Sequence, residues 1–112
     1  MALEVEGKVV ETDANGYLTD HAAWNEKVAE AMAQAEGVTL TQEHWDILHY
    51  LRDEYINNAG NQPNERTILK AMSDKWGRKA TSKDMYTLFP HMPSKQGAKV
   101  AGLPETRRKG GY

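Results

Sequence analysis

The side chains best suited to bind another molecule lie between residues 95 and 109. Lys95 and Lys99 are four residues apart in a run compatible with a short helix, so both ammonium groups face the same side. Two cations on one helix face can hold an acidic protein surface. Arg107, Arg108 and Lys109 follow in a glycine-ended segment with few apolar side chains, which buries little surface of its own. We therefore predict that this basic part of the chain binds a partner.

Catalysis by the chain itself is not predicted. The sequence contains no cysteine, which excludes a thiolate nucleophile, a disulfide and a thiolate metal site. It has no recognisable pairing of serine with histidine and no phosphate-binding glycine loop. His44 and His49 are five residues apart, which does not place two imidazoles on one helix face, and we expect His44 in solvent near a helix start. No catalytic residue, metal or cofactor is expected.

A second group of basic residues lies in the middle of the chain. They lie on or beside two predicted helices joined by a short turn containing Gly77, which is the general form of a helix-turn-helix. Such a pair can contact DNA phosphates, although no base-reading face is recognisable. DNA binding is therefore an alternative, and the residues that would carry it are Lys70, Lys75, Arg78, Lys79 and Lys83.

The charges are divided unequally along the chain. Residues 1–60 carry twelve acidic and three basic side chains, whereas residues 61–112 carry four acidic and eleven basic ones. This polarity favours an anionic partner for the second half, either nucleic acid or an acidic protein, although the two halves could also neutralise each other. The chain has 112 residues and no apolar run long enough to cross a bilayer, so we expect one domain in the cytoplasm and no membrane partner.

Several elements must position these side chains. β-prone residues on both sides of Gly7 predict a β-hairpin over about residues 3–10. Apolar residues at helical spacing, bounded by capping residues, glycines and prolines, predict the helices. Ile56 and Tyr86 are among the candidate core residues. The helices are expected at about residues 20–35, 42–57, 63–76, 82–88 and 94–101.

The expected architecture is mainly α (α+β). It is a small helical bundle with a helix-turn-helix-like pair and an N-terminal β-hairpin. Gly102 and Pro104 should end the last helix, because proline cannot continue it. A single domain would then cover residues 1–104, and residues 105–112 would form a flexible arm.

The sequence from Leu88 to Pro104 carries a recognisable motif, LFPxxPxKQxxKxAGLP. This motif resembles the C-terminal signature of the DsrC/TusE/DsvC sulfur-relay family, which includes a γ-subunit of sulfite reductase. The resemblance covers nearly the whole chain. Upstream it extends through Gly16-Tyr17-Leu18, Glu43-His44-Trp45-Asp46, Arg66 and Lys70-Ala71-Met72.

The resemblance implies a protein that carries sulfur as a persulfide on a cysteine near the tip of a flexible arm. Position for position, the second cysteine found in some members falls on Ala98. The arm cysteine falls on Gly111, or on Gly110 in another register. A persulfide needs a thiolate sulfur, and this sequence has none. The resemblance therefore implies a docking surface without the carrier chemistry.

Together these observations predict a non-catalytic DsrC/TusE-like protein that docks on or regulates sulfur-relay or sulfite-reductase partners. A DNA-binding regulator of sulfur metabolism is the alternative. A true sulfur carrier, for tRNA thiolation or dissimilatory sulfur metabolism, is the least favoured function. The predicted partner-binding residues, which include family positions 95, 96 and 99, are Lys95, Gln96, Lys99, Arg107, Arg108 and Lys109.

Overall fold

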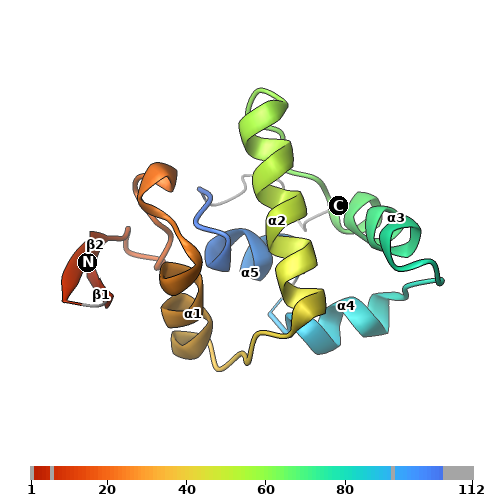
Figure 1. The fold of residues 1–112 in the computed structure, drawn as a ribbon, viewed down its shortest axis with the longest axis horizontal. Helices are drawn as coiled ribbons and strands as arrows, with labels where there is room; N and C mark the ends of the chain where they lie inside the picture. Colours follow the sequence, from red (N-terminus) through yellow and green to blue (C-terminus); the bar gives the residue numbers. More distant parts are fainter. Residues whose placement is uncertain (1, 6, 92, 105–112) are drawn as a thin grey trace.

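The protein is built around its last helix. In the computed structural model, which describes residues 2–5, 7–91 and 93–104, this helix lies at the centre and the other helices pack around it (Figure 1). A mainly helical fold with one small hairpin confirms the predicted fold class. The elements are β1 (Ala2–Val5), β2 (Lys8–Glu11), the 3₁₀ helix η1 (His21–Ala23), α1 (Glu26–Ala35), α2 (Gln42–Asn57), α3 (Glu65–Trp76), α4 (Ser82–Leu88) and α5 (Pro93–Val100).

The predicted hairpin is confirmed. β1 and β2 pair antiparallel, with Val5 opposite Lys8. Gly7 connects them with a φ of 80°, a conformation that glycine adopts without steric cost. The hairpin packs against α1. Its contact is a small apolar cluster in which Val5 is buried with Leu18, Val28 and Met32.

Two helices begin later than the sequence predicts, because an asparagine caps each of them. The Asn25 side chain accepts a hydrogen bond from the Val28 N–H at 2.9 Å, and α1 starts after it, while η1 occupies the earlier part of the predicted range. The Asn64 side chain accepts from the Thr67 N–H at 2.8 Å, which leaves Pro63 outside α3. The bounds of α2 and α4 agree with the prediction, and α5 begins and ends one residue earlier.

The prediction that His44 lies in solvent is wrong. Its side chain is buried, with 5% exposed. Nδ1 accepts hydrogen bonds from the Thr41 N–H (3.0 Å) and hydroxyl (2.8 Å), so Nε2 carries the proton and donates to the Leu88 carbonyl at 2.8 Å. Burial lowers the pKa of His44, against the opposing effects of the Leu88 hydrogen bond and the charge of Glu43. His44 thus ties the start of α2 to the loop that precedes α5.

The main core surrounds α5, which packs against α1, α2, α3 and α4. Gly97 permits the close approach of α2, since a Cβ there would lie 3.1 Å from Leu51 Cδ1. Ala98 is also buried. Two residues considered for the core lie outside it, because 54% of Ile56 and 36% of Tyr86 are exposed.

The two helices considered as a DNA-binding pair, α3 and α4, are consecutive and joined by residues 77–81. Gly77 ends α3 in a left-handed conformation, and the Thr81 hydroxyl caps α4 by accepting from the Asp84 N–H at 3.2 Å. Both helices pack on α5. Within the described parts of the chain, no helix is long and apolar enough to cross a membrane.

Candidate partner-binding site

The site is built on α5, whose N-terminus is fixed by a buried carboxylate. Pro93 occupies the first helical position, where its missing N–H costs nothing. The next free donor, the Ser94 N–H, donates to Glu65 Oε1 from the start of α3. A carboxylate at this end also complements the positive end of the helix dipole. The start of α5 is therefore held against α3.

The middle of α5 faces a polar network centred on Glu36. Gln96, with 2% exposed, donates through Nε2 to Glu36 Oε1 at 3.3 Å and accepts the His91 N–H at 3.0 Å. The Lys99 ammonium lies 3.4 Å from Glu36 Oε2 and 5.1 Å from the centre of the Tyr17 ring. One carboxylate at the end of α1 thus receives both side chains.

The two lysines predicted as a clamp therefore have different surroundings. Lys99 is engaged by Glu36 and Tyr17. Lys95 is half-buried, and among the described residues no carboxylate forms an ion pair with its ammonium group. Its backbone carbonyl accepts the Tyr17 hydroxyl at 3.5 Å. The structure joins Gln96 and Lys99 in one internal network and leaves the Lys95 charge outside it.

The C-terminal end of α5 is held by two side chains from distant parts of the chain. The Trp24 indole Nε1–H donates to the Val100 carbonyl at 2.9 Å. Arg52 donates to the Ala101 carbonyl at 2.8 Å and to the His21 carbonyl at 3.2 Å, and its guanidinium lies 4.3 Å from the Trp24 ring centre. Burial lowers the pKa of Arg52 from its usual high value. A cation here satisfies carbonyls that the helix leaves unpaired and complements its negative end.

Gly102 turns the chain away from α5 at this point. Its φ is 74°, and a Cβ at this position would lie 2.4 Å from Trp24 Cδ1, a distance that no side chain tolerates. Leu103 then returns to the core, where its N–H donates to the Ala98 carbonyl at 3.0 Å. Gln62 donates to the Pro104 carbonyl at 2.8 Å. We call residues 101–104, held in this way, the exit segment.

The remaining predicted partner-binding residues follow the exit segment. Arg107, Arg108 and Lys109 lie outside the described residues, as does Gly111, the position predicted to correspond to the family's arm cysteine. Ala98, predicted to correspond to the helix cysteine, is buried in the core with 2% exposed. The structure therefore fixes where the basic segment of residues 105–112 begins.

The basic residues considered for DNA binding are spread over α3, the turn after it and α4. Arg78 forms two ion pairs within the protein, with its guanidinium 2.6 Å from the Glu43 carboxylate and 3.3 Å from the Asp84 carboxylate. These carboxylates raise the pKa of Arg78, the hydrogen bond to Glu43 most of all. The other four side chains are exposed to solvent: Lys70, Lys75, Lys79 and Lys83.

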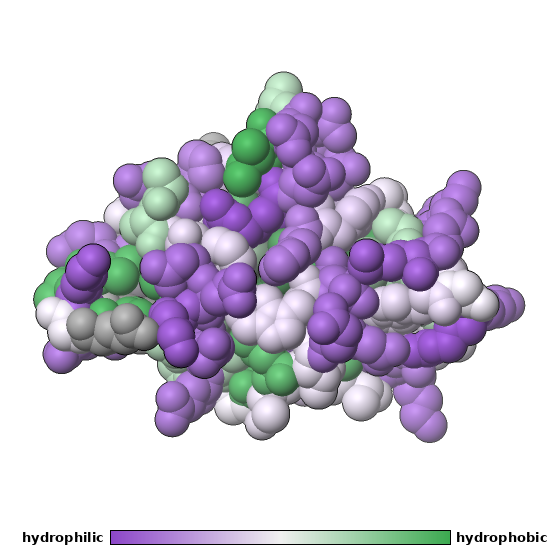
Figure 2. All heavy atoms as spheres, viewed as in Figure 1, coloured by the Kyte–Doolittle hydropathy of each residue, from purple (hydrophilic) through white to green (hydrophobic). Residues whose placement is uncertain are grey.

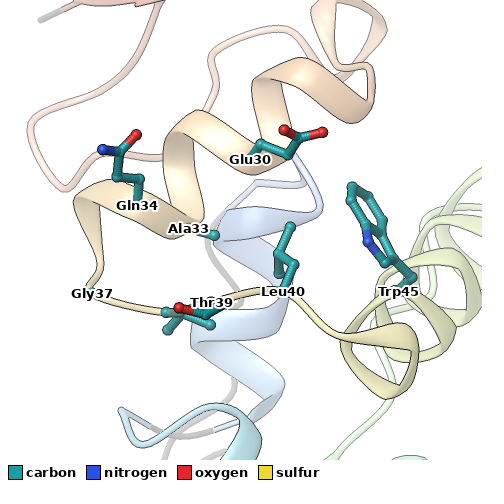
Figure 3. A pocket seen from close by; sticks show the side chains of 8 residues that line it. Glu30, Ala33, Gln34, Gly37, Thr39, Leu40 and Trp45 are labelled. Carbon is teal, nitrogen blue, oxygen red and sulfur yellow. The ribbon is translucent and has the colours of Figure 1, made fainter.

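The described residues show no constellation for catalysis. An open pocket of about 630 Å³ lies between α1 and the start of α2, with Ala33 and Leu40 on its floor and Trp45 at one side (Figure 3). Glu30 and Gln34 supply polar groups from α1, but no nucleophile and base meet there. Among the described residues, no group of three or more histidine, aspartate and glutamate side chains could hold a metal ion.

Sequence reasoning missed most residues that hold α5. The family resemblance upstream of the motif includes Tyr17. No local sequence pattern indicated the roles of Trp24, Arg52 and Gln62. Trp24 and its hydrogen-bond partner Val100 are 76 positions apart in the chain. Contacts at such separation depend on the packed fold rather than on nearby residues.

Known proteins share both the sequence and the fold of this chain. Residues 4–108 match the family described as "DsrC like protein". The chain is 43% identical over 104 residues to the sulfurtransferase TusE of Pectobacterium atrosepticum, a match covering 92% of this chain and 94% of that one. Among solved structures it resembles Allochromatium vinosum DsrC, with a TM-score of 0.87, 40% identity and coverage of 96% of this chain and 98% of that one.

A further solved structure has a similar fold. The oxidised γ-subunit of the dissimilatory sulfite reductase (DsrC) from Archaeoglobus fulgidus matches with a TM-score of 0.89 and 35% identity, again covering 96% of this chain and 98% of that one. The family match spans α5 and the exit segment. The chain therefore belongs to the DsrC-like family.

Proposed function

We propose that this chain is a non-catalytic DsrC-like protein that docks on sulfur-relay or sulfite-reductase proteins without carrying sulfur. Its relatives include a sulfurtransferase and a subunit of the dissimilatory sulfite reductase, so partners of these classes are the natural candidates. The protein would compete with a sulfur-carrying relative for the same partner or report on that partner's state. The proposed location is the cytoplasm, which cell fractionation would test.

The observation that supports docking most is the anchored exit segment. Trp24, Arg52 and Gln62 bind the carbonyls of residues 100, 101 and 104. Because the backbone of residues 100–104 is already fixed, a partner does not have to order it on binding. The segment that follows carries Arg107, Arg108 and Lys109. Docking would therefore use residues 105–112 together with the ammonium group of Lys95.

The side chains at the two predicted family positions support the proposed absence of sulfur chemistry. Ala98 offers a buried methyl group, and Gly110 and Gly111 have no side chain. Neither group can attack a persulfide donor, since the nucleophile in that exchange is a thiolate. Incubation with a persulfide-loaded donor protein should leave the mass of this chain unchanged. Addition of one sulfur atom, observed by mass spectrometry, would contradict the proposal.

A pull-down from native cell extract tests the docking. The full chain should retain sulfite-reductase or sulfur-relay subunits, identified by mass spectrometry. A chain ending at Pro104, and a full chain with Arg107→Ser, Arg108→Ser and Lys109→Ser, should both lose them. The triple substitution keeps the length of the chain, so it separates the role of the charges from that of the backbone. Equal recovery by all three proteins would count against docking through this segment.

DNA binding remains a second candidate because exposed lysines lie on α3, on α4 and in the turn between them, namely Lys70, Lys75, Lys79 and Lys83. Arg78 is a poorer candidate for a contact with a DNA phosphate, because its guanidinium already pairs with two carboxylates. If these lysines bind phosphates, affinity for duplex DNA should fall steeply with salt and with Lys75→Glu or Lys79→Glu. Fluorescence anisotropy that detects no binding at low salt would exclude this function.

A further inference from the structure

The end of α2 projects beyond the body of the protein (Figure 1). Figure 2 shows hydrophobic side chains at this projecting end, beside hydrophilic ones. Ile56, on the last turn, is 54% exposed. Ala59 follows in the exposed turn after the helix. More than half of this large apolar side chain therefore lies in solvent at the projecting end, where a partner could bury it.

The backbone of this tip has an uncommon conformation. Ala59 has a φ of 53°, and among the described residues it is the one non-glycine residue with positive φ. The turn is held closed by the Gly60 N–H, which donates to the Tyr55 carbonyl at 2.9 Å. Glycine would occupy position 59 without the steric cost that alanine bears. Alanine at this position adds an exposed methyl group to the same turn.

The tip also carries negative charge that the helix does not compensate. Asp53 and Glu54 lie near the C-terminal end of α2, where the helix dipole is already negative, and the last turn holds no basic residue. Asn57, Asn58 and Asn61 donate hydrogen bonds to these carboxylates at 2.6–2.9 Å, which orders them without neutralising them. A partner that covers this surface must therefore supply positive charge.

The tip is joined to the exit segment. Gln62, in the turn that follows the tip, donates to the Pro104 carbonyl at 2.8 Å. Pro104 is the last described residue before the basic segment of residues 105–112. A partner that takes up this segment is thus brought beside the α2 tip.

We propose that the α2 tip, formed by Asp53, Glu54, Ile56 and Ala59, is a second docking contact for the partner protein that binds residues 105–112. Its complement is an apolar depression bordered by lysine or arginine side chains. The two contacts have opposite charge, so the partner needs an acidic channel for the basic segment and a basic rim for the tip. This bipolar requirement selects one orientation of docking and rejects surfaces of uniform charge. The inference rests on the proposed function.

Calorimetric titration with two purified assemblies tests the inference: a dissimilatory sulfite reductase without its γ-subunit, and a sulfur-relay complex without its DsrC-like member. One of the two assemblies should bind the full chain. Ile56→Ser should lower the affinity for that assembly by about tenfold. Asp53→Asn combined with Glu54→Gln should weaken it and flatten its salt dependence. The control is Val9→Ser on the hairpin, where an apolar side chain is 66% exposed, and affinity should not change.

Ala59→Gly separates binding from folding. This change relieves the positive φ, so the thermal midpoint should rise, while loss of the methyl should weaken binding. If the tip has only a structural role, the Ala59→Gly variant should be more stable and should bind with unchanged affinity. Circular dichroism must show that each variant is folded.

The outcomes distinguish the two proposals. If the triple substitution at residues 107–109 abolishes binding and the tip variants bind like the unchanged chain, the proposed function stands and the second contact is refuted. If the tip variants lose binding and the triple substitution does not, the tip is a docking site and the role of the basic segment is refuted. If the unchanged chain binds neither assembly at high micromolar concentration, both proposals fail.

Discussion

At the scale of single residues, burial decides what the polar side chains near α5 can do. Gln96 and Lys99 match the family motif, yet both are bound inside the protein by Glu36. His44 belongs to the upstream part of the family resemblance. Its buried side chain links α2 to the Leu88 carbonyl. These side chains hold α5 in place, and the charges left for a partner are those of Lys95 and the segment beyond it.

His44 should make the stability of the protein depend on pH. Its folded-state pKa is lowered below the ordinary 6.5, chiefly by burial, so the unfolded chain binds more protons as the pH falls through that value. The free energy of unfolding should be fully maintained above the unfolded-state pKa and should decrease as the pH falls towards the folded-state pKa. Urea unfolding at about pH 7.5 and about pH 5 measures this. His44→Gln should cost about 2 kcal/mol at the higher pH and reduce the pH dependence.

The control for this experiment is His49→Gln. His49 is exposed on the same helix, so its replacement should preserve the stability of the protein. Equal pH dependence in His44→Gln and the unchanged protein would show that another group is responsible.

Gly102 and Gly37 offer a matched test of the exit segment. Both have a φ of 74°, but a Cβ at Gly102 would lie 2.4 Å from Trp24 Cδ1, whereas a Cβ at Gly37 meets nothing within 4 Å. Gly37→Ala should therefore cost about 1 kcal/mol for the backbone alone. Gly102→Ala should cost about 3 kcal/mol, since Trp24 must also move. Chemical denaturation that gives equal costs would mean that Trp24 does not fix this turn.

At the scale of elements, α5 is held at both ends by groups of the charge that its dipole favours. The Glu65 carboxylate lies at the N-terminus and the Arg52 guanidinium at the C-terminus. Each comes from another helix, α3 or α2. The short α5 thus owes its position to its neighbours rather than to its own eight residues, which would not form a stable helix alone.

Replacing Glu65 tests this arrangement. Glu65→Gln keeps an acceptor for the Ser94 N–H but removes the charge, and it should lower the free energy of unfolding by about 1 kcal/mol. Glu65→Ala leaves a buried donor unpaired and should cost about 2–3 kcal/mol. Thermal and urea unfolding provide the measurement. If both variants cost the same, the negative charge at the start of α5 has no stabilising role beyond its hydrogen bond.

At the scale of the whole molecule, the sequence predicted what local residues determine. Apolar residues at helical spacing, bounded by capping residues, predicted the bounds of α2 correctly, and the glycine turn predicted the hairpin. The cap at Asn25 was missed because the helix was predicted from about residue 20, where Asp20 instead caps η1. The hydrogen bonds of Trp24 to Val100 and of Arg52 to Ala101 could not be predicted, since they join positions 76 and 49 residues apart.

We propose that this DsrC-like protein docks on its partner through residues 105–112, which follow the anchored exit segment, without carrying sulfur. The most direct test is calorimetric titration of the full chain and of its Arg107→Ser, Arg108→Ser, Lys109→Ser variant into purified sulfite reductase and sulfur-relay assemblies. We predict binding of the full chain to one of these assemblies and a loss of affinity of at least about tenfold in the variant. Equal affinity of the two proteins, or no binding of the full chain to either assembly, would contradict this account.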